Sequence, residues 1–432
     1  MDTIETKMRK KLNTSIADCV KRRDLFKNPE TDFTKSRKLT PERVAKIFVN
    51  MNGNSLKKEI KEEFNYDKEM PSVSALIQQN EKLTIEFYDH LFKTFTSQIN
   101  RCKTFMGHHL LAGDGSSINI RFNKQDDETF IKNQSNGSGY NAVHLNALYD
   151  LNNNFYPAFR LQNGNGSELR AMIDMIDNVD FCPNTIVVLD RYFESYNLFA
   201  HVEQKGLKYV VRIKDVDSTG ILNKYNLPKD KEFDIHIRPI ITKKQSKEVK
   251  NNKAYTLLKG KDDFDFVDLQ NNWFYEMDIR VVRIEIAPGE FECLATNLDE
   301  DNFNSSALKE IYFRRWGIET SFRVLKYNFC LNSLHFKKLE SISKEIYAKI
   351  TMFNYCRAII NAIVIHQKQT LYIYQANIAS AIDNCKESFK RNDDSIDVVA
   401  LIQKDLLPVR PNRQFQRNLM RKHFVWFAYR AA

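Results

Sequence analysis

The segment Thr185-Ile-Val-Val-Leu-Asp190 is the part of this sequence that decides the fold. Five successive apolar or β-branched residues are typical of a strand buried on both faces, as in a parallel sheet covered by helices. A helical pattern from Asn197 to Gly206 follows Asp190, and a glycine stop signal closes it. Leu207 to Ile213 then has the pattern of another buried strand. This order of strand, helix and strand predicts an α/β unit.

The sequence before this unit predicts three further strands and a helix. Leu110 to Asp114 is a short apolar run that ends in a Gly-Asp-Gly turn sequence, and a polar loop follows it. Val143 to Tyr149 and Phe155 to Leu161 flank a turn-rich segment and predict a hairpin. Ser167 to Ile176 has helical spacing. We therefore expect a mixed sheet with helices packed on it.

The regions on either side of these strands have different patterns. Residues 1 to about 100 are predicted to be helical, with Thr40 as the N-cap before Pro41. Residues 215 to 300 are β-rich and indicate a separate β insertion, whereas residues 303 to about 390 are helical again. The last 23 residues, from Arg410 to Ala432, carry six Lys or Arg and no acid.

Composition limits the class of protein. Hydrophobic residues make up 42% of the 432 residues, which is enough for a core and excludes a disordered chain. The net charge of +10 favours nucleic acid or an anionic membrane as partner, although solubility alone would also explain it. The seven cysteines form no Cys-x-x-Cys pair, so we expect neither a zinc site nor disulfides, as in a reducing cytosol.

The sequence gives no sign of export or of membrane insertion. The N-terminus, MDTIETKMRKK, lacks the apolar stretch of a signal peptide. No run of 18 apolar residues is found, so no membrane span is expected. We therefore expect a cytoplasmic protein without a membrane partner.

Two aspartates and one glutamate are the strongest candidates for chemistry. Asp114 and Asp190 are each predicted at the end of a buried strand, and the carboxyl ends of adjacent strands converge on one crevice. With Glu319, three carboxylates can hold two magnesium ions, which activate an oxygen nucleophile and stabilise the leaving oxygen in phosphodiester chemistry. Taken singly, each aspartate is better explained as a turn residue or a helix cap.

The helix predicted from Leu308 to Tyr327 supplies the third carboxylate. Tyr312, Arg315, Glu319 and Lys326 fall on one narrow polar strip of this helix. The adjacent apolar strip, which should face the sheet, consists of Ile311, Ile318, Phe322 and Leu325. Glu319 could complete the metal cage, while the basic residues contact phosphates and Tyr312 donates to one. A surface helix with an Arg315–Glu319 pair is the alternative interpretation.

One glycine in this helix needs an explanation. Gly317 lies in the middle of the helix, where glycine costs about 1 kcal/mol relative to alanine. Close packing against the sheet or against nucleic acid would account for it.

These residues resemble a known family. The pattern Tyr312-x2-Arg315-x3-Glu319-x6-Lys326 is similar to the YREK signature of DDE transposases from bacterial insertion sequences, the insertion-sequence-4-type branch. Leu189-Asp190-Arg191-Tyr192 and Gly113-Asp114-Gly115 resemble the segments around that family's two aspartates. The basic C-terminal region is also similar. The resemblance extends over residues 70 to 425.

The resemblance implies an α/β fold with a ribonuclease H-like mixed sheet, interrupted by a β-rich insertion and flanked by helical N- and C-terminal regions. The implied division is a DNA-end-binding region over 1–100, a catalytic domain over 105–214 and 301–390, the insertion over 215–300, and a basic region over 391–432 for DNA or dimer contacts.

The resemblance also implies an activity and its partners. Asp114, Asp190 and Glu319 would be the catalytic residues and would bind Mg²⁺, for which Mn²⁺ would substitute. Tyr312, Arg315, Lys326 and Arg191 would contact DNA. The substrates would be double-stranded DNA with terminal inverted repeats and a target DNA, handled by a homodimer in a synaptic complex. The expected location is the bacterial cytoplasm, at the nucleoid.

Other functions stay open. The chain could be a metal-dependent DNA nuclease, a domesticated copy that cuts without integrating, or a catalytically decayed relative that only binds DNA. A ribonuclease is possible on fold grounds alone. Some relatives cut the second strand through a hairpin and stack an aromatic residue of the insertion on a flipped base; here Phe291 or Trp273 could serve, although either side chain is more often simply core.

Overall fold

The computed structural model describes residues 2–132, 139–164, 166–252, 254–258, 264–268, 270, 272–367 and 371–410. Most of the predicted basic C-terminal region therefore lies outside the described residues. None of the helices in the described part is both long and apolar enough to cross a bilayer. All seven cysteines are free.

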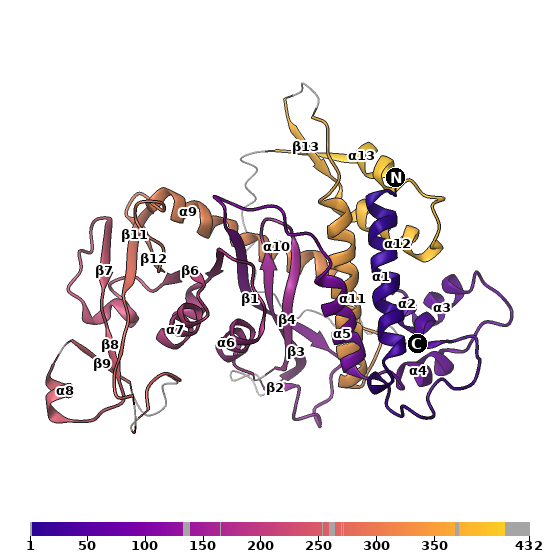
Figure 1. The fold of residues 1–432 in the computed structure, drawn as a ribbon, viewed down its shortest axis with the longest axis horizontal. Coiled ribbons are helices and arrows are strands. Elements are labelled where there is room, and N and C mark those ends of the chain that lie inside the picture. The colour runs from indigo at the N-terminus through magenta and orange to yellow at the C-terminus, as the bar shows by residue number, and fades with distance from the viewer. Residues whose placement is uncertain are drawn as a thin grey trace.

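Over the described residues, nine strands form one mixed sheet (Figure 1). Neighbouring strands run in the order β2-β3-β1-β5-β6-β12-β11-β7, and β4 also pairs with β3. The strands are β1 (His109–Ile120), β2 (Phe130–Lys132), β3 (Gly139–Asp150), β4 (Phe155–Asn163), β5 (Thr185–Leu189), β6 (Lys208–Ile213), β7 (Phe233–Ile237), β11 (Ile279–Ala287) and β12 (Glu290–Thr296). The central strands β1, β5 and β6 are parallel, and the other pairs are antiparallel.

The predicted α/β unit is confirmed. Strand β5 has the predicted bounds, and all five of its residues are buried, as expected for a strand covered on both faces. The hairpin joins β3 to β4, and Ser167 caps α6 (Glu168–Asn178) through a hydrogen bond from Arg170 N. Helix α7 (Tyr196–Gln204) is followed by Gly206, whose φ of 73° provides the left-handed turn into β6.

Helices cover both faces of the sheet. Helices α6 and α7 share a core with Val187 and Leu189 of β5 on one face. On the other face, Ile186 and Val188 pack with α9 (Ser305–Arg314). Helix α10 (Trp316–Tyr327) and α11 (Leu339–Ile360) cover β1, β3 and β4 on that same face.

The region 215–300 differs from the separate insertion that the sequence indicates. Strand β12 pairs with β6 through Thr296↔Val210 to Cys293↔Ile213, so β12, β11 and β7 extend the main sheet. A separate three-stranded sheet is formed by β8 (Ile240–Thr242), β9 (Tyr255–Leu257) and β10 (Tyr275–Glu276), next to α8 (Lys247–Asn251). The alternating pattern predicts strands but not their partners, because long-range pairing sets the register.

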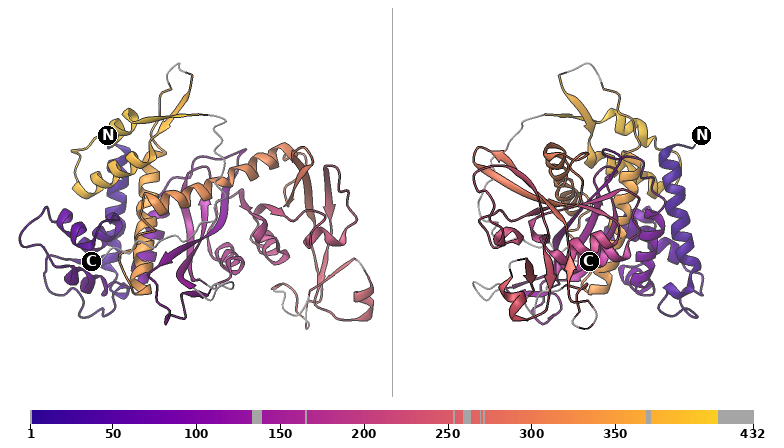
Figure 2. Two further views of the ribbon diagram at one scale, coloured as in Figure 1. Left: turned by 180° about the vertical axis from the view of Figure 1, so that it is seen from behind. Right: turned by 60° about the vertical axis from the view of Figure 1, so that its left-hand side comes forward.

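The N-terminal region is helical, as predicted. Its helices are α1 (Ile4–Lys21), α2 (Pro41–Asn50), α3 (Leu56–Glu63), α4 (Val73–Asn80) and α5 (Ile85–Thr96), with a 3₁₀ turn η1 (Arg23–Leu25) after α1. Thr40 caps α2, which confirms the predicted start of that helix. Figures 1 and 2 show these helices beside α11, and α1, α2 and α5 all contact it.

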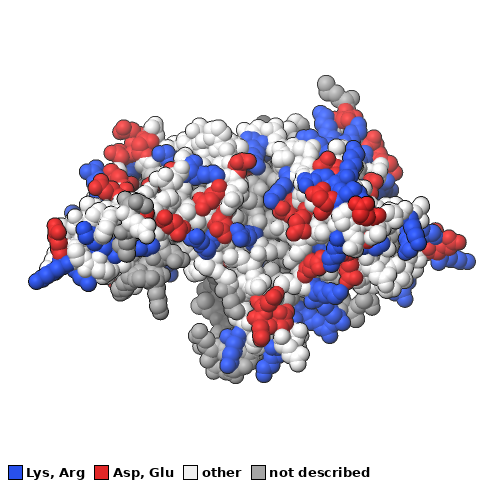
Figure 3. Space-filling model, turned by 60° about the horizontal axis from the view of Figure 1, so that its bottom comes forward, with Lys and Arg blue, Asp and Glu red and all other residues white. Residues whose placement is uncertain are grey.

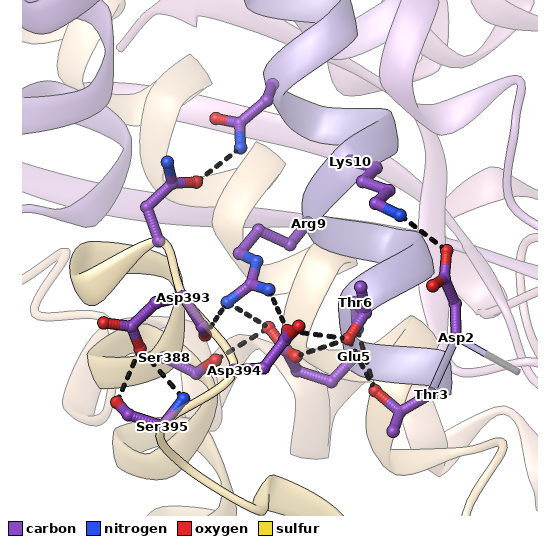
Figure 4. A network of polar contacts seen from close by, with 12 residues as sticks. Asp2, Thr3, Glu5, Thr6, Arg9, Lys10, Ser388, Asp393, Asp394 and Ser395 are labelled. Carbon is purple, nitrogen blue, oxygen red and sulfur yellow. Dashed lines mark hydrogen bonds and ion pairs between the residues drawn. The ribbon is translucent and has the colours of Figure 1, made fainter.

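A polar network fastens α1 to α12 (Ile378–Arg391) and to the loop between α12 and α13 (Val398–Lys404) (Figure 4). Buried Arg9 donates to the Asp393 carbonyl and to Asp394 Oδ1, and it lies 3.6 Å from Glu5 Oε1. Ser388 Oγ donates to Glu5 Oε1 at 2.7 Å. The two ends of the described chain are therefore held in one body.

Candidate active site

Asp114 lies within a strand, not at the end of one. The ladder between β1 and β3 continues from Leu111↔Asp150 to Ile120↔Asn141, so the predicted turn after Asp114 is wrong. The two flanking glycines are needed for packing instead. A Cβ at Gly113 would lie 2.5 Å from Leu189 Cδ2, and one at Gly115 would collide with His144 and Glu168. The Gly-Asp-Gly sequence therefore reflects crowding on the sheet face.

The structure nevertheless brings the two aspartates to one edge. The parallel ladder between β1 and β5 ends at Gly113↔Leu189; Asp114 is the next residue of β1, and Asp190 directly follows β5. Asp190 Oδ1 accepts a hydrogen bond from Tyr192 N at 2.8 Å and caps the short helix η2 (Arg191–Phe193). Asp190 therefore is a helix cap, as the alternative interpretation expects, and it also lies directly after the end of β5.

The predicted single helix is interrupted at Arg315. Helix α9 ends at Arg314 and α10 begins at Trp316, with Arg315 as the C-cap of one and the N-cap of the other. The apolar strip is buried as predicted. A Cβ at Gly317 would lie 2.8 Å from Leu151 Cδ2, so this glycine allows α10 to approach the β3–β4 hairpin.

Arg315 joins the helix carboxylate to the sheet carboxylate. Its Nη2 donates to Glu319 Oε1 at 2.8 Å, and its Nη1 lies 3.9 Å from Asp114 Oδ2. The arginine side chain is only 7% exposed, so the pair is not the solvated ion pair of a surface helix. Nε of Arg315 is buried and has no hydrogen-bond partner among the described residues, which leaves one donor for an oxygen ligand.

The charges at this edge act on one another. Burial first of all, and then the nearby charges of Asp190 and Glu319, raise the pKa of Asp114 to about 6. The Gly115 N–H, which donates to Asp114 Oδ1 at 2.8 Å, and the Arg315 guanidinium oppose that rise in pKa. All three predicted carboxylates therefore belong to one electrostatic cluster, which also contains the Arg315 guanidinium.

The other predicted DNA contacts lie around this cluster at different depths. Arg191 is exposed beside Asp190, and Lys326 is half-buried on α10. Tyr312 is 8% exposed and packs in the core under α9. Burial raises the pKa of the Tyr312 hydroxyl, and the positive charges of Arg315 and Arg212 partly oppose this rise. Tyr312 thus faces Arg212 rather than open solvent.

The residue types at this edge suit a hard divalent cation. Three carboxylates provide oxygen donors, and an excess of negative charge there is balanced only in part by Arg315. As the side chains stand, no three His, Cys, Asp or Glu in the described ranges form a group that could hold a metal ion.

Next to the cluster is a cavity that the sequence did not reveal. It has a volume of about 260 Å³ and lies between β6, β11, β12 and the junction of α9 with α10. Arg212, Glu292, Arg315 and Trp316 line it, and Arg212 pairs with Glu292 at 3.0 Å. Trp316 is 44% exposed. The nearest sequence signal was the aromatic residue inside the YREK run, which had no assigned role.

One family model matches more than half of this chain. The family model described as "Transposase DDE domain" matches residues 106–355, more than half of the chain. Among solved structures, the chain is similar to a piggyBac transposase synaptic complex with hairpin DNA, with 11% identity, a TM-score of 0.42, and coverage of 96% of this chain and 79% of that one. No curated protein matches. The matched residues include Asp114, Asp190 and Glu319, and the chain belongs to the DDE transposase family.

Proposed function

We propose that this DDE transposase belongs to the YREK branch, binds the inverted-repeat ends of an insertion sequence, cleaves DNA there and joins the 3′ ends to a target. The observation that carries this proposal is the cluster itself. Asp114 and Asp190 directly follow the last paired residues of the ladder between β1 and β5, and Arg315 links Glu319 to Asp114. The contact of Arg315 with both Glu319 of α10 and Asp114 of β1 supports a role for the three carboxylates in one site.

We propose a ribonuclease H-like catalytic domain. Three antiparallel strands, β4, β3 and β1, followed by the parallel strands β5 and β6 support it. The division into 1–100, 105–214 with 301–390, 215–300 and 391–432 stays a prediction. Since β7, β11 and β12 continue the main sheet, the insertion would move with the catalytic domain.

Mg²⁺, with Mn²⁺ as substitute, would be held by Asp114, Asp190 and Glu319 and would supply activation of the attacking oxygen and charge stabilisation at the leaving oxygen. The chain's own residues perform the remaining tasks. Arg315 neutralises the crowded carboxylates and provides the buried Nε donor for a phosphate oxygen. Arg191 and Lys326 would hold the DNA backbone on either side of the cluster.

DNA binding would be local to this edge. Figure 3 shows basic and acidic side chains intermingled over the face it draws, so the net charge of +10 does not by itself mark a DNA path. The cavity beside Arg315 combines two arginines with Trp316, a set that suits a phosphate and a stacked base. Trp273 and Phe291 fit less well, because Lys244 lies over Trp273 and Arg283 over Phe291.

We propose a hairpin route for the second strand, by proximity of the freed 3′ hydroxyl to the site that released it. The test is a denaturing gel of an end-labelled linear substrate with protein and Mg²⁺. A transient species near twice the length of the released strand supports the route, and double-strand breaks without it exclude the route.

The function is tested by cleavage and joining. Asp114→Ala, Asp190→Ala and Glu319→Ala should each lose Mg²⁺-dependent strand cleavage and still bind an end duplex, since metal carboxylates serve chemistry while positive groups dominate affinity. The exposed Asp180→Ala serves as the matched control and should cleave normally. Near-normal cleavage by any of the three variants removes that residue from the site.

The same assay separates the alternatives. A nuclease would cleave without joining 3′ ends to a target plasmid, and a decayed DNA-binding relative would bind without cleaving. A homodimer holding two ends is proposed for the joined product, because each chain carries one cluster in its described residues.

A further inference from the structure

An exposed tyrosine lies two residues after Asp190, and the proposed function gives it no role. Tyr192 is 60% exposed, whereas its neighbour Phe193 is fully buried in the core beneath α6 and α7. The two rings meet edge to face, with their centroids 5.6 Å apart. Phe193 therefore packs the η2 turn onto the core, and Tyr192 stands outside it. A single exposed ring is ordinary on a protein surface, so its meaning depends on where and how it is held.

The turn that carries Tyr192 is fastened on both sides. Before the turn, Asp190 Oδ1 accepts a hydrogen bond from Tyr192 N at 2.8 Å. After the turn, the Glu194 carboxylate accepts from Lys214 N at 2.8 Å and from Ile221 N at 2.6 Å. These bonds tie η2 to the segment that follows β6. A ring presented by such a turn can bind a partner without a large loss of conformational entropy.

The Tyr192 ring lies at the edge of the sheet that carries the two aspartates. Burial of part of the side chain, and then the charges of Glu168 and Asp190, raise the pKa of the Tyr192 hydroxyl, so the hydroxyl is within electrostatic reach of both carboxylates. Glu168 in turn packs against β1, because a Cβ at Gly115 would lie 2.8 Å from Glu168 Oε2. Tyr192 is therefore near β1 and β5 at the level of Asp114 and Asp190.

The side chains of η2 suit a nucleic acid. Arg191, next to Tyr192, is also exposed. A cation beside an aromatic ring can hold the backbone while the ring stacks on a base. The Tyr192 hydroxyl is a poor phosphate site, because the carboxylates of Glu168 and Asp190 would repel the anion. The group that contacts DNA is therefore the face of the ring.

We propose that Tyr192 stacks on the terminal base of the cleaved DNA end and holds that end at the site between cleavage and joining. A base inside an intact duplex has both faces covered by its neighbours, and an extruded base takes a pocket that encloses it. Tyr192 stands on the surface and offers one face. Cleavage beside Asp190 uncovers one face of the terminal base, which such a ring can cover. This inference rests on the proposed function and assigns a residue to one stage of it.

The test compares an intact end duplex with a pre-cleaved one that stops at the 3′ hydroxyl, both with the full-length chain. Tyr192→Ala removes the ring, and Tyr192→Phe keeps the ring without its hydroxyl. The matched control, Tyr66→Ala, removes a tyrosine that is 63% exposed between α3 and α4. Fluorescence anisotropy gives the Kd for each duplex, and a gel assay with Mg²⁺ gives the rates of cleavage and joining. Unchanged melting curves would show that the variants are folded.

Tyr192→Ala should raise the Kd for the pre-cleaved duplex on the order of tenfold or more, the loss expected for one stacked base, and should slow joining. Its Kd for the intact duplex and its rate of first-strand cleavage should stay close to those of wild type. Tyr192→Phe should behave as wild type, because it keeps the ring. Tyr66→Ala should keep the wild-type ratio between the two Kd values.

A second arm of the test removes the base instead of the ring. An abasic terminal nucleotide in the pre-cleaved duplex should weaken wild-type binding by a similar factor and cause little further loss in Tyr192→Ala, because both changes remove one contact. Two losses that multiply, an equal loss for both duplexes, or a defect in Tyr192→Phe would overturn the proposal. If wild type cleaves and joins and Tyr192→Ala matches it throughout, this inference alone fails. A wild type that neither cleaves nor joins would overturn the proposed function and this inference with it.

Discussion

Asp114→Asn should stabilise the protein at neutral pH while removing its activity. The structure holds Asp114 largely buried beside Asp190 and Glu319, with its pKa raised from 3.8 to about 6. A carboxyl whose pKa is raised by folding binds more protons in the folded than in the unfolded state between these values. Stability therefore falls as pH rises from about 4 to about 6 and stays lower above that range.

The magnitude follows from the same shift. At 1.36 kcal/mol per unit, ionised Asp114 costs about 3 kcal/mol at pH 7.5 and about half of that at pH 5. The side chain is 19% exposed, so little of this cost is lost to solvent screening. Asparagine keeps the shape and the acceptor for Gly115 N–H without the charge. For a chain of this length the gain corresponds to a rise in Tm of about 3 °C.

The assay is thermal and urea unfolding of wild type and Asp114→Asn in EDTA at pH 7.5 and pH 5. Asp180→Asn is the control, because this exposed aspartate should change stability by no more than about 0.5 kcal/mol. Equal stability of Asp114→Asn and wild type at pH 7.5 would refute the argument. A gain that is as large at pH 5 as at pH 7.5 would also refute it, since the charge would not be its source.

Three further outcomes are expected. Arg315→Ala and Lys326→Ala should each reduce, by about 0.9, the slope of log K for binding an end duplex against log salt concentration. An unchanged slope would show that the residue makes no phosphate contact. Glu345→Ala should cost about 3–5 kcal/mol in urea unfolding, because buried Lys349, now 3.5 Å from the carboxylate, loses its counter-charge and His335 Nδ1 loses a contact of 2.7 Å; a loss below about 1 kcal/mol would contradict this. Gly317→Val should cost about 1–3 kcal/mol by forcing α10 from the β3–β4 hairpin and should slow cleavage, and wild-type behaviour in both assays would count against close packing there.

The sequence predicted those parts of the fold that local pattern determines. A continuous β-branched run gave β5 its bounds, because both of its faces are buried. The 3.6-residue period placed Glu319 beside Arg315, whose ion pair is now seen. By contrast, the turn expected at Asp114 was wrong, because Gly113 and Gly115 serve contacts with residues distant in sequence.

The remaining features depend on long-range pairing. The cavity beside Trp316 requires β6, β11 and β12 to be neighbours, and alternation alone does not specify which strands meet. The break at Arg315 is similar: the sequence around it continues in helical spacing, and the position of α10 over the hairpin is a tertiary feature. The sequence therefore predicted the charged residues Glu319 and Arg315 but not the strands and helix junction that surround them.

The contact of the N-terminal helices with α11 has a consequence for synthesis. Leu12 of α1 and Phe87 of α5 share one core with Ile346 and Phe353 of α11, which is made more than two hundred residues later. At 5–20 residues per second, the ribosome leaves these apolar faces uncovered for on the order of 10–50 s. Residues 1–100 should therefore not fold as an independent unit, and we predict a non-cooperative thermal transition for that fragment. A cooperative one would show that the region matures before α11 emerges.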